Sequence, residues 1–301
     1  MDTTNATPES GSSSSEGAAA NVTPLPSAKE KLLKGNREVI TDFYVSDNIS
    51  NEPTKFKYKV FVRLNAKEKR FKRISFEHCI FDACYLNTCV FDTCDFTGCR
   101  FVGSNFHQTA FTGCTFDYAT FERCQIDDDI LRSEAPHEEN LRMRFARSLR
   151  MNYQQIGDAK AVNRAISLEL QATSIYLMKS WSSQESYYQK KFGGLKRIPQ
   201  FLKWAEFWIL DFIWGNGESI FKLLRTIILI LIFLALYDTS RNGNLLHIDD
   251  MLAAFAKAPG EFLGITTPSN FSPGVSDSIV ATRLVSFALL TAMLVKRFGR
   301  R

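Results

Sequence analysis

The sequence predicts a β-solenoid, followed by an α-helical hairpin and a membrane domain in which two transmembrane helices flank a re-entrant loop. Three observations predict this order. Large apolar residues recur at every fifth position from Phe71 to Ile126, helical spacing replaces that period from Glu138 to Ser180, and two long apolar segments occupy the last third of the 301-residue chain. We therefore expect one domain built from repeats and one built from lipid-facing helices.

The five-residue period involves two positions of each repeat. One position holds Phe, Leu or Ile, and the position two residues earlier holds a small residue. The large residues are Phe71, Phe76, Phe81, Leu86, Phe91, Phe96, Phe101, Phe106, Phe111, Phe116, Phe121 and Ile126. The small residues are Cys79, Cys84, Cys89, Cys94, Cys99, Ser104, Thr109, Cys114, Ala119 and Cys124. A run of this length at one spacing indicates an internal repeat.

A period of five fits neither a helix nor a flat strand. A helix would spread these residues around its surface, and a strand would turn them to alternate faces. A coil that turns a corner every five residues would keep all of them inside. Four sides make a square coil of about twenty residues, and successive coils would stack at about 4.8 Å. The repeats give fewer than three coils, and a short stack of this kind needs a cap at each end.

This pattern resembles the pentapeptide-repeat family over residues 71–128, and the resemblance implies a right-handed quadrilateral β-helix. The small position also holds Ser104, Thr109 and Ala119, so we interpret the seven cysteines as buried packing residues. Zinc would need four converging ligands, which evenly spaced residues on different sides of a coil do not provide. Stacked cysteines such as Cys79 and Cys99 lie near enough for a disulfide, but parallel side chains and a reducing compartment oppose one.

The region before the repeats is basic. Residues 1–30 are rich in Ser, Thr, Ala and Pro and predict a disordered tail, and residues 31–70 predict basic cap strands. Lys55 to Leu64 alternates lysine with apolar residues, as expected of a strand that covers the N-terminal end of the solenoid. Its lysines, Lys55, Lys57 and Lys59, would share one face. That face either keeps an edge solvated and unpaired, or contacts anionic lipid head groups or another acidic partner.

Helical spacing follows the repeats. Residues 129–200 predict two antiparallel cytoplasmic helices, Glu138 to Gln155 and Ala159 to Ser180, with Asp158 as the N-cap of the second. Residues 201–217 are rich in aromatic side chains and predict a helix at the membrane interface, where tryptophan is enriched. Packing of that segment against the helical hairpin is the alternative.

Residues 218–301 contain the two predicted transmembrane segments, Ser219 to Asp238 and Ser278 to Val295. Basic residues precede the first and follow the second, whereas the connecting loop is acidic. This charge pattern predicts a multi-pass protein of the cell inner or plasma membrane with both termini in the cytoplasm. Arg283 lies inside the second segment, where a charge must face protein or water, and is a functional candidate for that reason.

The connecting loop predicts a short helix, Asp249 to Ala258, ended by Pro259 and Gly260, and then an extended stretch from Gly264 to Thr267. A span, a half-buried helix, an extended turn and a second span form the layout of a two-span pore. The order "LRMNYQQIGD", "GNGES", a span and a terminal "VKRFGRR" resembles bacterial pentapeptide-repeat proteins with a C-terminal ion-channel-like pore domain. That resemblance implies a potassium-channel-type filter before the last span.

The chain departs from that filter, because potassium filters read TVGYG whereas this loop has a single glycine followed by Ile, Thr, Thr and Pro. A non-selective, closed or vestigial pore is therefore left open. The candidate pore-lining residues are Gly264, Ile265, Thr266, Thr267, Ser286 and Thr291.

The leading functional hypothesis is an ion-channel or pore-like homo-tetramer that passes a monovalent cation, with the repeats as a cytoplasmic sensing or assembly domain. The alternative is a membrane-anchored scaffold whose repeats bind a protein partner. A DNA-mimicking protector of topoisomerase fits less well, because the solenoid is short and a membrane tail has no role there. We expect no nucleic-acid partner, cofactor, metal or enzymatic activity, because the sequence has no nucleophile–base pair and no phosphate-binding loop.

Overall fold

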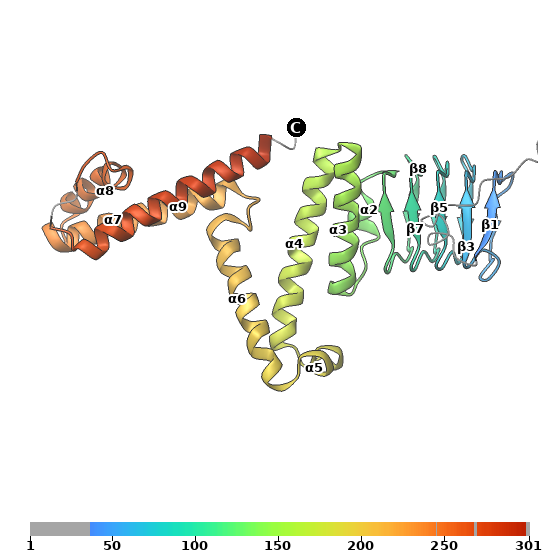
Figure 1. The fold of residues 1–301 in the computed structure, drawn as a ribbon, viewed down its shortest axis with the longest axis horizontal. Helices are drawn as coiled ribbons and strands as arrows, with labels where there is room; N and C mark the ends of the chain where they lie inside the picture. Colours follow the sequence, from blue (N-terminus) through green and yellow to red (C-terminus); the bar gives the residue numbers. More distant parts are fainter. Residues whose placement is uncertain (1–36, 245, 268–269, 299–301) are drawn as a thin grey trace, which may run out of the picture. The chain divides into compact units, whose positions relative to one another are not determined.

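The computed structural model describes residues 37–244, 246–267 and 270–298, so the predicted tail at residues 1–30 lies outside the described part. Its N-terminal third is a parallel β-solenoid of about four turns, and the remainder is helical (Figure 1). The solenoid confirms the repeat architecture that the five-residue period predicts.

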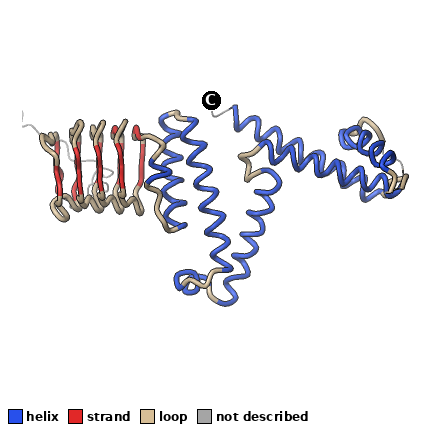
Figure 2. The backbone as a smooth tube through the Cα atoms, turned by 180° about the vertical axis from the view of Figure 1, so that it is seen from behind, coloured by secondary structure: helices blue, strands red, loops and turns tan. Residues whose placement is uncertain are grey.

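Parallel strands from successive coils form three ladders. Figure 2 shows these short strands in red, joined by tan turns. The first ladder contains β1 (Glu38–Thr41), β3 (Lys59–Val62), β5 (Ile80–Asp82), β7 (Arg100–Val102) and β10 (Thr120–Glu122). The second contains β2 (Ile49–Ser50), β4 (Arg70–Lys72), β6 (Val90–Asp92) and β9 (Ala110–Thr112), and the third pairs β8 (Asn105–Phe106) with β11 (Gln125–Ile126).

The sequence predicts fewer than three coils. The solenoid is longer than this because it begins before Phe71. Phe61 pairs with Phe81, and Phe81 with Phe101, so each of these steps is twenty residues. Ile40 pairs with Phe61 and Ile49 with Phe71, so the first coil needs one or two residues more. The segment expected to cap the solenoid, Lys55 to Leu64, instead contributes β3 between β1 and β5.

Stacked phenylalanines fill the centre of the solenoid. In one column the rings of Phe76, Phe96 and Phe116 lie parallel, with centroids 5.2 Å and 5.0 Å apart. Phe81, Phe101 and Phe121 form a second column with spacings of 5.0 Å and 4.9 Å. These distances are close to the strand spacing of a sheet, so the coil repeat itself sets the ring stacking.

The small position has a hydrogen-bonding role as well as a packing role. The thiol of Cys84 donates to the carbonyl oxygen of Phe61 at 3.4 Å, and that of Cys99 donates to Phe76 at 2.9 Å. The Ser104 hydroxyl makes the equivalent bond to Phe81 at 3.3 Å, which explains why Cys and Ser are interchangeable here. All seven cysteines are free and buried, as expected of packing residues.

Most corners of the coil have left-handed backbone two residues after the large residue. His78 has φ of 57°, Thr93 has 56° and Gly98 has 68°. Glycine suits Gly98 for a second reason, since an added Cβ would overlap the ring of His78 in the coil below. Non-glycine residues pay roughly 1 kcal/mol or more for this conformation, so the stacking between coils must offset that cost repeatedly.

Charged residues on adjacent coils form ion pairs with one another. Lys57 lies 2.6 Å from Glu77, Lys59 lies 2.7 Å from Glu38, and Lys72 lies 3.4 Å from Asp92. Part of the basic segment before the repeats is therefore neutralised by the acidic coils on either side of it.

Two helices close the C-terminal end of the solenoid, α2 (Ile130–Ser133) and α3 (Glu139–Ile156). Side chains of α3 accept hydrogen bonds from the last coil: Ser148 from the amide of Phe121 at 2.8 Å, and Gln155 from Arg123 at 2.9 Å. Asn152 accepts from the amide of Cys124 and donates to the carbonyl of the same residue. Helix α3 thus acts as a polar cap on the solenoid.

The predicted hairpin is confirmed by α3 and α4 (Ala159–Ser182). Gly157 ends α3 with φ of 80°, and the Asp158 carboxylate accepts from the amide of Ala161 at 2.9 Å, as expected of an N-cap. Glu169 of α4 bridges Arg147 and Arg150 of α3 at 2.8 Å each, which fixes the two helices side by side.

The remaining helices continue toward the C-terminus. They are α5 (Ser186–Phe192), the 3-10 turn η1 (Gly194–Lys196), α6 (Arg197–Trp214), α7 (Ile220–Asn242), α8 (Ile248–Leu263) and α9 (Pro273–Phe298). Helix α6 packs on α4 through Trp204, whose ring centroid lies 5.3 Å from that of Trp181.

We expect Asn152→Ala to destabilise the solenoid strongly. The substitution leaves the buried amide and carbonyl of Cys124 without partners, and each unpaired group costs about 1–3 kcal/mol. Thermal unfolding followed by circular dichroism measures the effect. Gln154→Ala, at an exposed position of the same helix, is the matched control, and equal melting temperatures for the two variants would contradict the capping role.

We also expect Cys84 and Cys124 to resist alkylation in the native protein. Burial raises the pKa of the Cys84 thiol to about 12 and that of Cys124 to about 11, so little thiolate exists at neutral pH. Thr112→Cys, at an exposed position of a neighbouring coil, should label quickly and serves as the positive control. Rapid labelling of Cys84 or Cys124 without unfolding, detected by mass spectrometry, would contradict this expectation.

Candidate functional site

Helices α7 and α9 are long and apolar enough to cross a membrane, and only 17% and 11% of their most apolar stretches are buried inside the chain. Ser219 begins α7 by accepting a hydrogen bond from the amide of Lys222. The 23 residues of α7 rise about 34 Å at 1.5 Å each, which exceeds the roughly 30 Å hydrocarbon core of a bilayer. Both predicted spans are therefore present as helices that could span a membrane.

Helix α8 packs on α7 and extends beyond its predicted end. Ala254, Ala258 and Phe262 contact Leu234 and Ala235 in a small apolar cluster. The helix was expected to stop at Ala258, but it continues through Pro259 to Leu263 because packing of Phe262 stabilises the added turn. The proline removes one backbone donor without ending the helix.

The stretch from Gly264 to Thr267 is not extended as expected. Gly264 adopts φ of 77° and caps α8, with its amide donating to the carbonyl of Glu261 at 3.1 Å. The amides of Ile265 and Thr266 both donate to the carbonyl of Gly260, at 2.8 Å and 3.2 Å. The first three of these four residues therefore form a helix-ending turn, and the side chains of Ile265, Thr266 and Thr267 are exposed.

Arg283 lies against this turn. An added Cβ at Gly264 would overlap the Arg283 guanidinium, so glycine is what allows this arginine to approach. The C-terminal end of α8 carries partial negative charge from its free carbonyl groups, which favours a cation there. The charge that the sequence marks as costly in a membrane therefore has a favourable position within the chain.

The two candidates on α9 lie on different faces of the helix. Ser286 is buried, whereas Thr291 is exposed. Five residues correspond to about 140° around an α-helix, so the two side chains point to different sides of the helix. The structure brings Gly264 and Thr266 together at the end of α8, but it does not bring Ser286 and Thr291 together.

Sequence reasoning missed two buried carboxylates, Asp238 of α7 and Glu261 of α8. They are 6% and 7% exposed. Asp238 accepts a hydrogen bond from Asn242 at 2.6 Å, whereas the Oε2 atom of Glu261 has no partner among the described residues. The sequence contained one signal of this burial: each acid lies about one helical turn after a buried apolar residue of its own helix.

A tight corner joins α6 to α7. Gly215 ends α6 with φ of 66°, and Lys222 of α7 lies 2.7 Å from Asp211 of α6. Thr226 donates to the carbonyl of Ile213 at 2.8 Å, and Arg225 donates to that of Phe212. Side chains of α7 thereby satisfy carbonyl groups that the end of α6 leaves free.

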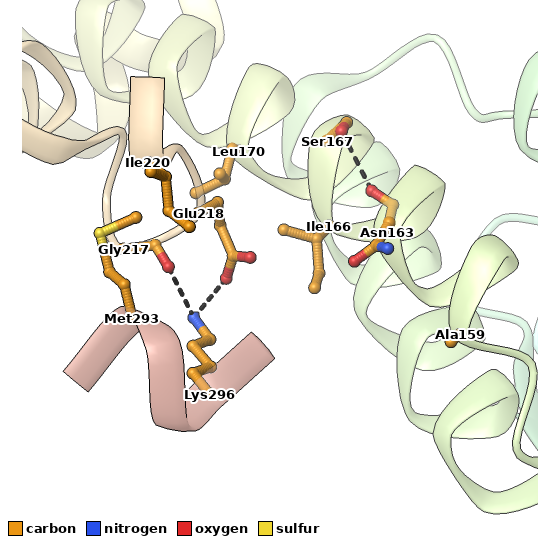
Figure 3. Close-up of a pocket in the computed structure, with 10 residues that line it drawn as sticks. All are labelled: Ala159, Asn163, Ile166, Ser167, Leu170, Gly217, Glu218, Ile220, Met293 and Lys296. Carbon is orange, nitrogen blue, oxygen red and sulfur yellow. Dashed lines mark hydrogen bonds and ion pairs between the residues drawn. The ribbon is translucent and has the colours of Figure 1, made fainter. Parts of the chain in front are cut away.

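The end of α9 reaches the same corner. Lys296 donates to the carbonyl of Gly217 at 3.2 Å and pairs with the Glu218 carboxylate, as Figure 3 shows. A groove of about 460 Å³ adjoins this ion pair, and α4 contributes Asn163, Ile166, Ser167 and Leu170 to its lining. The corner is thus the place where α6, α7 and α9 are linked by polar contacts.

The three lysines proposed to meet an anionic partner do not form one free face. Lys57 and Lys59 are held in ion pairs with Glu77 and Glu38. Lys55 is exposed, with its ammonium group 5.5 Å from the ring centroid of Phe56. Within the described residues, no group of three or more His, Cys, Asp or Glu side chains is arranged to hold a metal ion.

We expect Gly264→Ala to destabilise the hairpin of α7 and α8. Left-handed backbone disfavours alanine by roughly 1 kcal/mol, and the new methyl group would also displace Arg283. The melting temperature of the detergent-solubilised protein measures the effect. Gly274→Ala is the control because nothing lies within 4 Å of its added Cβ. The double variant Gly264→Ala/Arg283→Ala should recover part of the loss, and no recovery would contradict the contact.

Comparison with known proteins identifies the repeat region of the chain. Residues 70–108 and 89–128 match the family model of pentapeptide repeats, with 8 copies. No curated protein matches the chain. Nineteen chains of solved structures match, among them a trypsin-treated variant of QnrB1, described as a plasmid-mediated fluoroquinolone resistance protein. It is 15% identical, with a TM-score of 0.13, and the match covers 31% of this chain and 64% of that one. The chain therefore carries pentapeptide repeats over residues 70–128, as the five-residue period predicts.

Proposed function

We propose that several copies of this chain assemble an ion-channel or pore-like protein in a membrane. The observation that carries the proposal is the outward exposure of α7 and α9. Phe221 and Phe233 of α7 are 82% and 76% exposed, and Leu284 of α9 is 63% exposed. Such surfaces are unfavourable in water, and lipid or neighbouring subunits would cover them.

The proposal assigns the protein to the cell inner or plasma membrane, with both termini in the cytoplasm and the solenoid as a sensing or assembly module. Two helices cannot enclose a pore, so the proposal requires a homo-oligomer, and we favour a tetramer that passes a monovalent cation. In this arrangement α8 and the following turn occupy a re-entrant position. The five-residue period supports a right-handed, quadrilateral section for the solenoid, and the proposal includes no catalytic role.

The polar groups of α7, α8 and α9 favour a pore over a simple anchor. An anchor needs only apolar helices, whereas these helices bury Asp238 and Glu261 and hold Arg283 at the end of α8. Ionisable groups within membrane segments are expensive and commonly mark an ion pathway. A pore accounts for their presence on three packed helices, whereas a tether does not require them.

A membrane-anchored scaffold is the second candidate, and one observation favours it. The turn at Gly264 to Thr266 directs two amides to the carbonyl of Gly260, so it does not present a row of carbonyl groups as a filter does. In that case the repeats would bind a partner protein and α7 and α9 would hold the complex at the membrane.

Ion flux through the purified protein in liposomes tests the proposal. We expect the wild type to conduct potassium or sodium and Thr266→Trp to abolish flux, because the larger side chain would block the path beside α8. Phe233→Trp is the matched control, since it places the same side chain on the exposed surface of α7 and should leave flux unchanged.

Absence of flux from correctly inserted wild-type protein, under both cation gradients and with a discrete oligomer confirmed by light scattering, would favour the scaffold. Equal loss in Thr266→Trp and Phe233→Trp would show that the substitutions act on insertion and would remove the support for a path at Thr266.

A further inference from the structure

Helix α6 carries an apolar stripe that is largely exposed in the described part of the chain. Its side chains are between 42% and 61% exposed. The members are Ile198, Leu202, Trp208, Ile209 and Phe212. Their spacing of three, four and seven residues places them on one side of the helix, within an arc of about 120°.

The opposite side of α6 holds the helix to the protein. Trp204 packs on Trp181 of α4, and Phe207 and Asp211 line a groove together with Leu170 and Ile175 of α4. Helix α6 is therefore attached along one side, and the stripe is its free side. Water would be an unfavourable neighbour for so many aromatic and aliphatic side chains in a row.

The stripe leads directly to the apolar surface of α7. The corner from Gly215 to Ser219 separates the two helices, and the links from Lys222, Arg225 and Thr226 fix the last turn of α6 to the first turns of α7. Phe212 closes the stripe with the Arg225 guanidinium 4.3 Å from its ring centroid. The stripe and the exposed surface of α7 are thus consecutive along the chain and joined by several side-chain contacts.

The composition of the stripe and its N-terminal end suits the boundary between lipid chains and head groups. Tryptophan and phenylalanine concentrate at this depth of a bilayer. Just before α6, Leu195 is 84% exposed, and the exposed Lys190 and Lys196 make no ion pair among the described residues. An exposed leucine beside free lysines can enter the boundary while the ammonium groups meet phosphate.

We propose that the apolar stripe of α6 binds phospholipid and lies in the interfacial layer of the membrane that α7 and α9 cross. This inference rests on the proposed function only for the insertion of α7 and α9. It adds that α6 is a surface helix, so that the membrane holds the helical domain by a second contact besides the spans.

Tryptophan quenching by brominated lipid tests the proposal. The full-length protein is reconstituted in phosphatidylcholine liposomes that carry bromine near the ester end of the acyl chains, or near the methyl end. We expect ester-end bromine to quench the wild type most, and Trp208→Phe to lose much of that quenching. Trp181→Phe should keep it, because Trp181 lies on α4 behind α6. Trp208→Phe conserves an aromatic side chain, so the fold should persist.

A reporter on α7 separates failure of this inference from failure of the proposed function. Phe233→Trp in the Trp208→Phe background should be quenched by methyl-end bromine if α7 is inserted. Quenching at Phe233→Trp together with identical quenching of wild type and Trp208→Phe would overturn the interfacial position of α6 and leave insertion intact. No quenching at either site would overturn both proposals.

A second copy of the chain is the competing occupant of the stripe. In that case Trp208 would be insensitive to bromine at either depth, and Ile209→Glu would reduce the oligomer to smaller species in detergent, as measured by light scattering. That pair of results would overturn lipid binding by α6. An unchanged oligomer in Ile209→Glu, together with the loss of quenching in Trp208→Phe, would support it.

Discussion

The last coil of a parallel β-solenoid leaves a row of backbone amides without a strand to receive them. In this protein Glu134, Ser148, Asn152 and Gln155 accept those hydrogen bonds, from Cys114, Phe121, Cys124 and Arg123 respectively. Ser148, Asn152 and Gln155 lie at spacings of three and four residues, so one face of α3 matches the end of the coil. This match attaches α3 to the repeats, and α3 in turn is joined to α4 by ion pairs.

From this cap a continuous series of side-chain contacts leads through α4 and α6 to α7. The Glu169 ion pairs join α3 to α4, Trp181 and Trp204 join α4 to α6, and Asp211 and Lys222 join α6 to α7. Each step is a specific side-chain contact between neighbouring helices. A partner bound to the repeats could therefore act on α7 through α4 and α6, and the coupling would pass through the corner where Lys296 meets Glu218.

Local signals in the sequence predict most of the elements but not the contacts between them. The period predicts the coils, and Gly157 with Asp158 predicts the turn between α3 and α4, because these features depend on neighbouring residues. The first coil is missed because its steps to the next are 21 and 22 residues, although Phe56, Phe61 and Ala66 continue the five-residue period toward it. The capping role of Asn152 and the burial of Glu261 depend on residues distant in the sequence, so no local pattern reveals them.

The end of α8 shows what a pore would require of this chain. In the single chain, Ile265 and Thr266 donate to Gly260, and Arg283 lies at the same turn. A filter would need these residues extended, so two hydrogen bonds worth about 0.5–1.5 kcal/mol each must be exchanged for contacts with other subunits. An oligomer interface can supply that amount several times over, whereas a monomeric anchor gives no reason to open the turn. In the proposed pore, assembly and conduction would therefore be coupled through the conformation of this one short turn.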